Sequence, residues 1–98
     1  MTYIDDVASA VRARVPPELM PDGDLDSLFR IYAVLVLAKR QAVQLEDVHD
    51  GWSAWMSAQD PAHPSLRPFA ELSAQVRDGD RPYLKALRAT AAALGPRP

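Results

Sequence analysis

Hydrophobic residues recur at helical spacing in four stretches of this chain, and the first lies at the N-terminus. Thr2 stands before that stretch and forms a capping-box pattern with Asp5, which predicts that a helix begins here. Pro16 and Pro17 are expected to end it. A helix with one apolar face must pack against other parts of the chain. Its apolar positions are Ile4, Val7, Ala8, Val11 and Val15.

The second stretch predicts a helix that starts near Asp24 or Asp26 and runs to about Arg40. Residues 31–38 are apolar on every side, which is typical of a buried central helix. A strand is the competing interpretation of residues 31–37, but the helical pattern extends well beyond them and no partner strand is indicated. The positions that carry the helical pattern are Leu25, Leu28, Phe29, Tyr32 and Leu35.

The third stretch predicts a helix over about residues 45–58, ended by Asp60 and Pro61. Gly51 lies in the middle of it, where glycine costs roughly 1 kcal/mol relative to alanine. This glycine either allows another helix to approach closely or has no structural purpose. The apolar positions of the stretch are Leu45, Val48, Trp52, Trp55 and Met56.

Residues 60–72 carry three prolines and are predicted to be irregular. Ser73 is placed to cap one short turn over residues 74–77. Asp80 is expected to cap the last helix, with Pro82 near the position that proline tolerates best and Gly95 at the C-terminal cap. The apolar positions of this fourth stretch are Tyr83, Leu84, Leu87, Ala91 and Leu94.

The predicted fold is therefore all-α: a small four-helix domain with a proline-rich irregular segment between the third and fourth helices. We expect a single domain over residues 1–98. Residues 1–23 would form the N-terminal helix and its loop, and residues 24–95 the helical core. The side chains predicted to form the core are Leu28, Tyr32, Leu35, Val48, Trp52, Phe69, Leu72, Leu84 and Leu87.

The composition excludes several classes of function. The chain has 98 residues, 48% of them hydrophobic, and no cysteine, so disulfides and thiolate chemistry are excluded. Its 11 Lys and Arg residues are balanced by 13 Asp and Glu residues, and we expect no nucleic-acid partner and no membrane association. A soluble, cytoplasmic protein is expected, since the acidic N-terminus lacks the pattern of a signal peptide. Frequent Ala, Arg, Asp and Pro are typical of a GC-rich genome, such as that of an actinobacterium or its phages.

His49 and His63 are the only histidines, and both have aspartates nearby in the sequence. Metal sites usually need three or four ligands at fixed spacing, and no such pattern is present. A triad can be written from Ser53 or Ser65 with a histidine and an aspartate, but there is no nucleophile elbow. We therefore expect no enzyme, no metal and no cofactor. Each imidazole is instead expected to bond a backbone carbonyl near the proline-rich segment and organise it.

Two kinds of side chain could contact a ligand. Trp52 or Trp55 could stack on a planar ligand, although core packing is the alternative for both. Arg67, Arg77 and Arg81 could pair with phosphates, or each could simply lie on the solvated surface.

Residues 46–95 resemble the repeat domain of ryanodine receptors. In that family a helix carries a histidine followed three residues later by tryptophan, as His49 and Trp52 do here. A His-Pro-x-Leu-x-x-Phe/Tyr-x-x-Leu motif follows, matched by residues 63–72, and then a short polar helix and a leucine-rich helix. The family's Gly-Trp-x-Tyr-Gly segment is missing from residues 57–62. The resemblance implies a helical module with a regulatory role that senses nucleotide-derived signals, as in bacterial defence systems.

We therefore predict a non-enzymatic binding or regulatory module, a small accessory protein from a phage or from a defence or counter-defence locus. It would recognise a protein partner or a nucleotide-derived small molecule. The residues predicted to line its groove are His49, Trp52, His63, Arg67 and Arg81. The alternative is a structural protein that forms a homo-oligomer through the apolar face of its N-terminal helix.

Overall fold

The computed structural model describes residues 2–96, and in that range it contains five α-helices, three 3-10 turns and no strand. The all-α prediction is confirmed, with an irregular proline-rich segment before the last helices. In chain order the elements are α1 (Tyr3–Arg12), η1 (Pro17–Leu19), α2 (Leu25–Lys39), η2 (Arg40–Ala42), α3 (Leu45–Gln59), η3 (Phe69–Glu71), α4 (Ala74–Asp78) and α5 (Arg81–Leu94).

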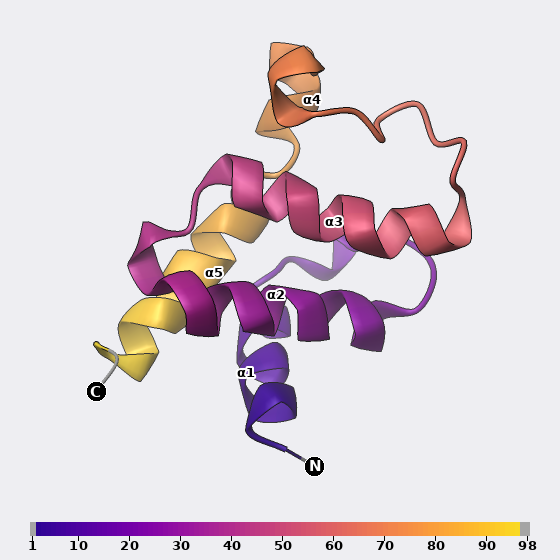
Figure 1. Ribbon diagram of the computed structural model, residues 1–98. Coiled ribbons are helices and arrows are strands. Elements are labelled where there is room, and N and C mark those ends of the chain that lie inside the picture. The colour runs from indigo at the N-terminus through magenta and orange to yellow at the C-terminus, as the bar shows by residue number, and fades with distance from the viewer. Residues whose placement is uncertain (1, 97–98) are drawn as a thin grey trace.

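Helix α2 is at the centre of the arrangement. It runs antiparallel to α3, with α5 crossing behind the pair and α1 packed below (Figure 1). It contacts all three of these helices. The irregular segment and α4 lie at one end of the molecule, beyond α3 (Figure 1).

Local side-chain chemistry sets most of the helix ends. The Thr2 amide donates to Asp5 Oδ2 at 3.1 Å while the Asp5 amide donates to Thr2 Oγ1, which completes the predicted capping box. Asp24 accepts from the Ser27 amide at 3.2 Å and caps α2. Helix α1 ends at Arg12, earlier than the prolines alone would require, because the chain tightens into a turn that buries Val15.

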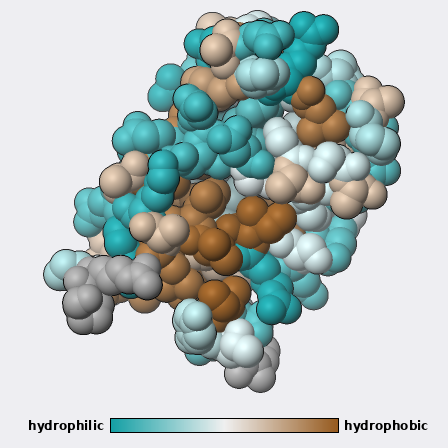
Figure 2. Space-filling model, in the orientation of Figure 1, coloured by the Kyte–Doolittle hydropathy of each residue, from teal (hydrophilic) through white to brown (hydrophobic). Residues whose placement is uncertain are grey.

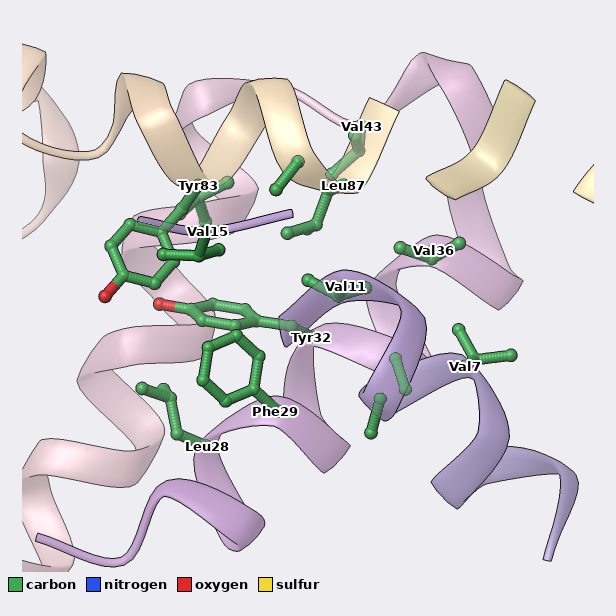
Figure 3. Close-up of a cluster of buried hydrophobic side chains, with 14 of the residues drawn as sticks. Val7, Val11, Val15, Leu28, Phe29, Tyr32, Val36, Val43, Tyr83 and Leu87 are labelled. Atoms are coloured by element: carbon green, nitrogen blue, oxygen red, sulfur yellow. The ribbon is translucent and has the colours of Figure 1, made fainter. Parts of the chain in front are cut away.

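Aromatic and branched side chains from α1, α2, α3 and α5 form the core, and Figure 3 shows part of it. The Tyr32 ring lies 5.8 Å from Phe29 in an edge-on arrangement and 5.5 Å from Tyr83 of α5, measured between centroids. Offset and edge-on aromatic pairs of this kind add about 0.5–1.5 kcal/mol each to simple burial. The apolar face of α1 is buried against this cluster, with Val11 completely inaccessible.

Three of the predicted core residues are only half-buried: Leu35, Trp52 and Phe69. Leu35 lies at the edge of the contact between α2 and α3, and Trp52 packs against the core from outside it. Phe69 lies on η3 and is covered by the Arg77 guanidinium, whose carbon is 4.8 Å from the ring centroid. The other predicted core residues are buried: Leu28, Tyr32, Val48, Leu72, Leu84 and Leu87.

The expectation that α2 is buried on every side is wrong. Val34 is 52% exposed, and Figure 2 shows hydrophobic surface where α2 runs in Figure 1. The neighbouring helices cover the other sides of α2, and its solvent side keeps apolar residues without burying them.

Gly51 allows α2 and α3 to approach closely. A Cβ at this position would lie 3.1 Å from Leu35 Cδ1 and 3.2 Å from Ile31 Cγ2, tighter than most Cβ contacts. Of the two interpretations of this glycine, the structure supports close approach. Within residues 2–96, no helix is long and apolar enough to cross a membrane.

Candidate functional site

Three of the predicted site residues form one aromatic cluster. The His49 ring stacks on Trp52 with centroids 5.8 Å apart, and Trp52 meets His63 edge-on at 5.0 Å. Helix α3 presents His49 and Trp52, while His63 comes from the irregular segment that follows. We call these three residues the His49 cluster.

His49 is buried, and its hydrogen bonds indicate which ring nitrogen carries a proton. Its Nε2 lies 2.6 Å from the backbone carbonyl oxygen of Arg67 and 3.3 Å from Ser53 Oγ. A carbonyl can only accept, so Nε2 must carry the proton in this contact. A nitrogen that is already protonated cannot take a proton from Ser53, and the pair is therefore not arranged as nucleophile and general base.

His63 has the opposite role. Its Nδ1 accepts a hydrogen bond from the Ser65 amide at 3.0 Å. The expectation of a carbonyl partner holds for His49 and is wrong for His63, because the ring of His63 caps an N–H in its own turn. Together the two histidines hold the proline-rich segment against α3.

Asp80 lies beside this cluster. It occupies the N-cap position of α5, but with φ −88° and ψ −6° its side chain makes no capping bond, so the predicted cap is wrong in this respect. The carboxylate lines a small cavity of about 120 Å³ together with Tyr32, Trp52 and Tyr83. Burial raises the pKa of Asp80, and the nearby His49 opposes that rise. Burial, and then the charge of Asp80, also raises the pKa of Tyr32 and of Tyr83, so both phenols remain neutral donors.

The side chains of the two predicted arginines, Arg67 and Arg81, are not part of the His49 cluster. Arg67 contributes its carbonyl, and its side chain lines a shallow hollow of about 500 Å³ beside Asp50 and Ser53. Arg81 begins α5, with Nε 2.8 Å from Asp78 Oδ1, and lines a different hollow. The five predicted residues therefore do not line one groove.

The sequence analysis missed a hollow that is larger than the one beside Asp50. It has a volume of about 630 Å³ and lies between α5 and the segment that follows α1. We call it the α5 groove. Its lining residues are Arg14, Pro16 and Leu19 on one wall and Arg81, Pro82, Lys85, Ala86 and Ala89 on α5.

Both walls of the α5 groove are held by contacts with the core. The buried side chain of Val15 anchors the segment that carries Pro16. The Tyr83 hydroxyl donates to the Leu19 carbonyl oxygen at 2.8 Å and ties η1 to α5. The Leu19 side chain is left 47% exposed. The groove is therefore a built feature of the tertiary structure, with an apolar surface open to solvent.

All the charged residues that line the α5 groove are cations: Arg14, Arg81 and Lys85. Within residues 2–96 Arg81 pairs with Asp78, while no ion pair is formed by Arg14 or Lys85. Two rim charges are thus not neutralised by a carboxylate, which favours an anionic occupant.

A second, smaller hollow continues the basic surface along α5. It has a volume of about 270 Å³ and is lined by Arg81, Leu84, Lys85 and Arg88. Arg88 donates from Nε and Nη2 to the Val43 carbonyl oxygen at 3.1 and 2.9 Å, which ties α5 to the link before α3. Helix α5 contains three basic residues and no acidic one, and this local signal was readable in the sequence. The opposite wall comes from residues some sixty positions earlier in the chain, and its place beside α5 was not readable in the sequence.

The part of the chain that the structure describes contains no group of three His, Asp or Glu side chains able to hold a metal ion. The prominent feature is instead a cation-rimmed apolar groove, next to a cluster of aromatic residues with a structural role.

The fold is a small all-α domain with an open groove whose charged lining residues are cations. The model of the family described as "Domain of unknown function (DUF7701)" matches residues 2–92, so the chain belongs to that family. Comparisons with curated proteins and with solved structures give no match.

The family match overturns the resemblance to the ryanodine-receptor repeat. The matching family is a different one and covers α1 as well as the region that carried the resemblance. The motif residues have local packing functions here: His49 holds a carbonyl, Leu72 is buried and Phe69 lies under Arg77. These contacts give the motif residues a local structural role that does not depend on the ryanodine-receptor family.

Proposed function

We propose that this protein is a non-enzymatic binding module that recognises a partner protein through the α5 groove. The observation that supports this most strongly is an apolar hollow of about 630 Å³ whose charged lining residues are all cations. Exposed apolar surface rimmed by polar groups is typical of interaction sites. The arrangement of His49 and Ser53 supports the non-enzymatic part, because the Nε2 proton is already shared with a carbonyl.

The shape of the groove favours a protein over a small molecule. Sites for small molecules usually enclose most of the ligand surface. Here Leu19 is half-exposed, and Lys85 and Ala89 are exposed on the α5 side. A protein segment laid along the groove would cover these residues.

Other parts of the expectation remain proposals. A cytoplasmic location is consistent with the cysteine-free composition. An actinobacterial or phage origin is based on composition alone. The nucleotide ligand and the defence-locus role were implied by the ryanodine-receptor resemblance, and they lose their basis with it.

A photo-crosslinking experiment tests the proposed function. A benzophenone amino acid would replace Ala89 in the groove and, as a matched control, the exposed Ala58 near the end of α3. After irradiation in cells of the source organism, we expect a discrete adduct with another protein from position 89 only. No adduct at position 89, or equal adducts at both positions, would contradict the proposal.

The alternative function is that of a structural protein that forms a homo-oligomer. The surface that supports it differs from the predicted one, which was the apolar face of α1. Val7 and Val11 of α1 are buried within the chain, so these residues cannot contact a second copy. Exposed Val34 and the hydrophobic area over α2 provide one instead (Figure 2). Mass measured across a concentration series, for the wild type and Val34→Lys, tests this. Val76→Lys, at a 42% exposed valine of α4, is the matched control.

A further inference from the structure

We infer that the segment bound in the α5 groove is an acidic amphipathic helix of the partner protein. This inference rests on the proposed function and names the chemistry of the partner. It follows from the spacing of apolar residues on the groove floor, the spacing of cations on its rim and the charge that the fold leaves unneutralised.

The apolar floor follows one face of α5. Pro82, Ala86 and Ala89 are four and three residues apart, so they lie on the same side of the helix over about 10 Å. Their side chains are small, and Leu19 rises on the opposite wall. A second helix packs well on such a surface when its own apolar residues recur at three- and four-residue spacing.

The cations have the spacing of a helix as well. Arg81 and Lys85 are one turn apart, about 6 Å along the axis, so carboxylates one turn apart on a neighbouring helix can face both. Arg14 lies on the other wall and can meet acidic residues on the far side of the same segment. A helix with an apolar stripe flanked by Asp or Glu therefore complements the groove in shape and in charge.

Helix stability does not explain this charge pattern. Arg81 is the first residue of α5, where a positive charge opposes the helix dipole, and it pairs with Asp78 at 2.8 Å. Lys85, one turn further on, forms no ion pair among the described residues. An acidic partner would neutralise Lys85 and would share Arg81 with Asp78.

The geometry favours a helix over an anionic membrane. The apolar atoms line a hollow, and the cations Arg14 and Lys85 lie on its rim. A flat bilayer would contact the cations but leave the hollow unfilled. Interfacial membrane binding needs an apolar face that can be buried in the acyl region, and a hollow does not present such a face.

Binding of designed peptides tests the inference. The probe is a fluorescein-labelled peptide of about 18 residues, long enough to populate helix in water, with Leu at three- and four-residue spacing and Glu beside the stripe. A second peptide has Lys in place of every Glu, and a third has the acidic composition in an order without a stripe. Fluorescence anisotropy should show that the acidic striped peptide binds at least about tenfold more tightly than either control, and that added salt weakens it.

Variants assign the binding to the groove. Arg81→Glu/Lys85→Glu should weaken the acidic peptide by about tenfold or more, and Ala89→Trp should block it without changing charge. The matched controls are Arg30→Glu/Arg67→Glu, which changes charge by the same amount elsewhere, and Ala58→Trp on α3. Circular dichroism would establish that each variant is folded, and loss of binding in a control variant would overturn the assignment.

The two proposals can fail separately. If the acidic striped peptide binds no better than its controls, or if only vesicles of anionic phosphatidylglycerol bind, the acidic-helix inference is overturned. A crosslinked partner at position 89 would then still support the proposed function, with a partner of other chemistry. If neither peptide binding nor crosslinking at position 89 is observed, both proposals fall.

Discussion

His49 Nε2 lies 2.6 Å from the carbonyl oxygen of Arg67, eighteen residues further along the chain. The bond joins the middle of α3 to the irregular segment that leads to α4. The backbone hydrogen bonds of that segment are local turn bonds, such as Leu66 N–H to the His63 carbonyl, and they do not join it to α3. A buried imidazole with a defined donor nitrogen is therefore a structural support, and this function explains why a polar residue lies on the buried side of α3.

Replacing this imidazole should destabilise the protein. His49→Ala removes a buried hydrogen bond and a ring stacked on Trp52, and we expect the free energy of unfolding to fall by about 2–3 kcal/mol. His63→Ala, whose ring is only half-buried, should cost less than about 1 kcal/mol. Urea denaturation followed by circular dichroism measures both, and equal losses would contradict the structural role assigned to His49.

Asp80 should make stability depend on pH. Burial raises its pKa in the folded state, so the protonated form is favoured on folding. The resulting stability is complete below the unfolded-state pKa and is lost as pH rises through the folded-state pKa. Asp80→Asn stays neutral throughout and breaks no capping bond, because the Asp80 side chain makes none. We expect this variant to be more stable than the wild type at pH 7 and the difference to shrink toward pH about 3.5. A difference that grows on acidification would exclude this account.

Gly51 should tolerate alanine but not a branched side chain. Alanine gains about 1 kcal/mol of helix propensity, which offsets the tight contact with Leu35 and Ile31. Gly51→Val adds further atoms in the same place and should cost about 1–3 kcal/mol by overpacking. Ala54→Val, at an exposed position of the same helix, gives the propensity cost of the step from alanine to valine. If the stability difference between Gly51→Ala and Gly51→Val equals that cost, the close approach of α2 and α3 has no energetic effect.

Replacing Arg40 by glycine should stabilise the protein. It has φ +52° and ψ −133°, a conformation that side chains rarely adopt, and its buried Nε has no hydrogen-bond partner within residues 2–96. We expect Arg40→Gly to stabilise the protein by about 0.5–1 kcal/mol, a rise in Tm of roughly 4 °C. Gln41→Gly, in the same turn, has no positive φ to relieve and should lower Tm. Calorimetry of the two variants distinguishes these outcomes.

The helices could be predicted because their signals are local. Thr2 with Asp5, Asp24 and Ser73 each bond an amide three residues away, and such pairs are visible in any sequence. Spacing of three and four residues likewise identified the apolar faces that were found buried. The short α4 and the irregular segment before it followed from serine and proline positions.

The candidate site could be predicted only in part. His49, Trp52 and His63 were expected together and do meet, because one helix and the adjoining segment hold them. Arg81 was grouped with them because it is near in sequence to the irregular segment, yet the direction of α5 places its side chain in another hollow. Sequence proximity gives no information about which way a helix leaves a turn.

By itself the sequence determined where helices start and stop, which faces are apolar and that α5 carries only basic charge, since these depend on neighbours within one or two turns. Only the tertiary structure decided that Leu19 and Ala89 line the same groove, that Val34 stays exposed and that His49 is buried. These features depend on how α1, α2, α3 and α5 cross. The crossing is selected by the packing of core side chains such as Tyr32 and Tyr83, which come from distant parts of the chain.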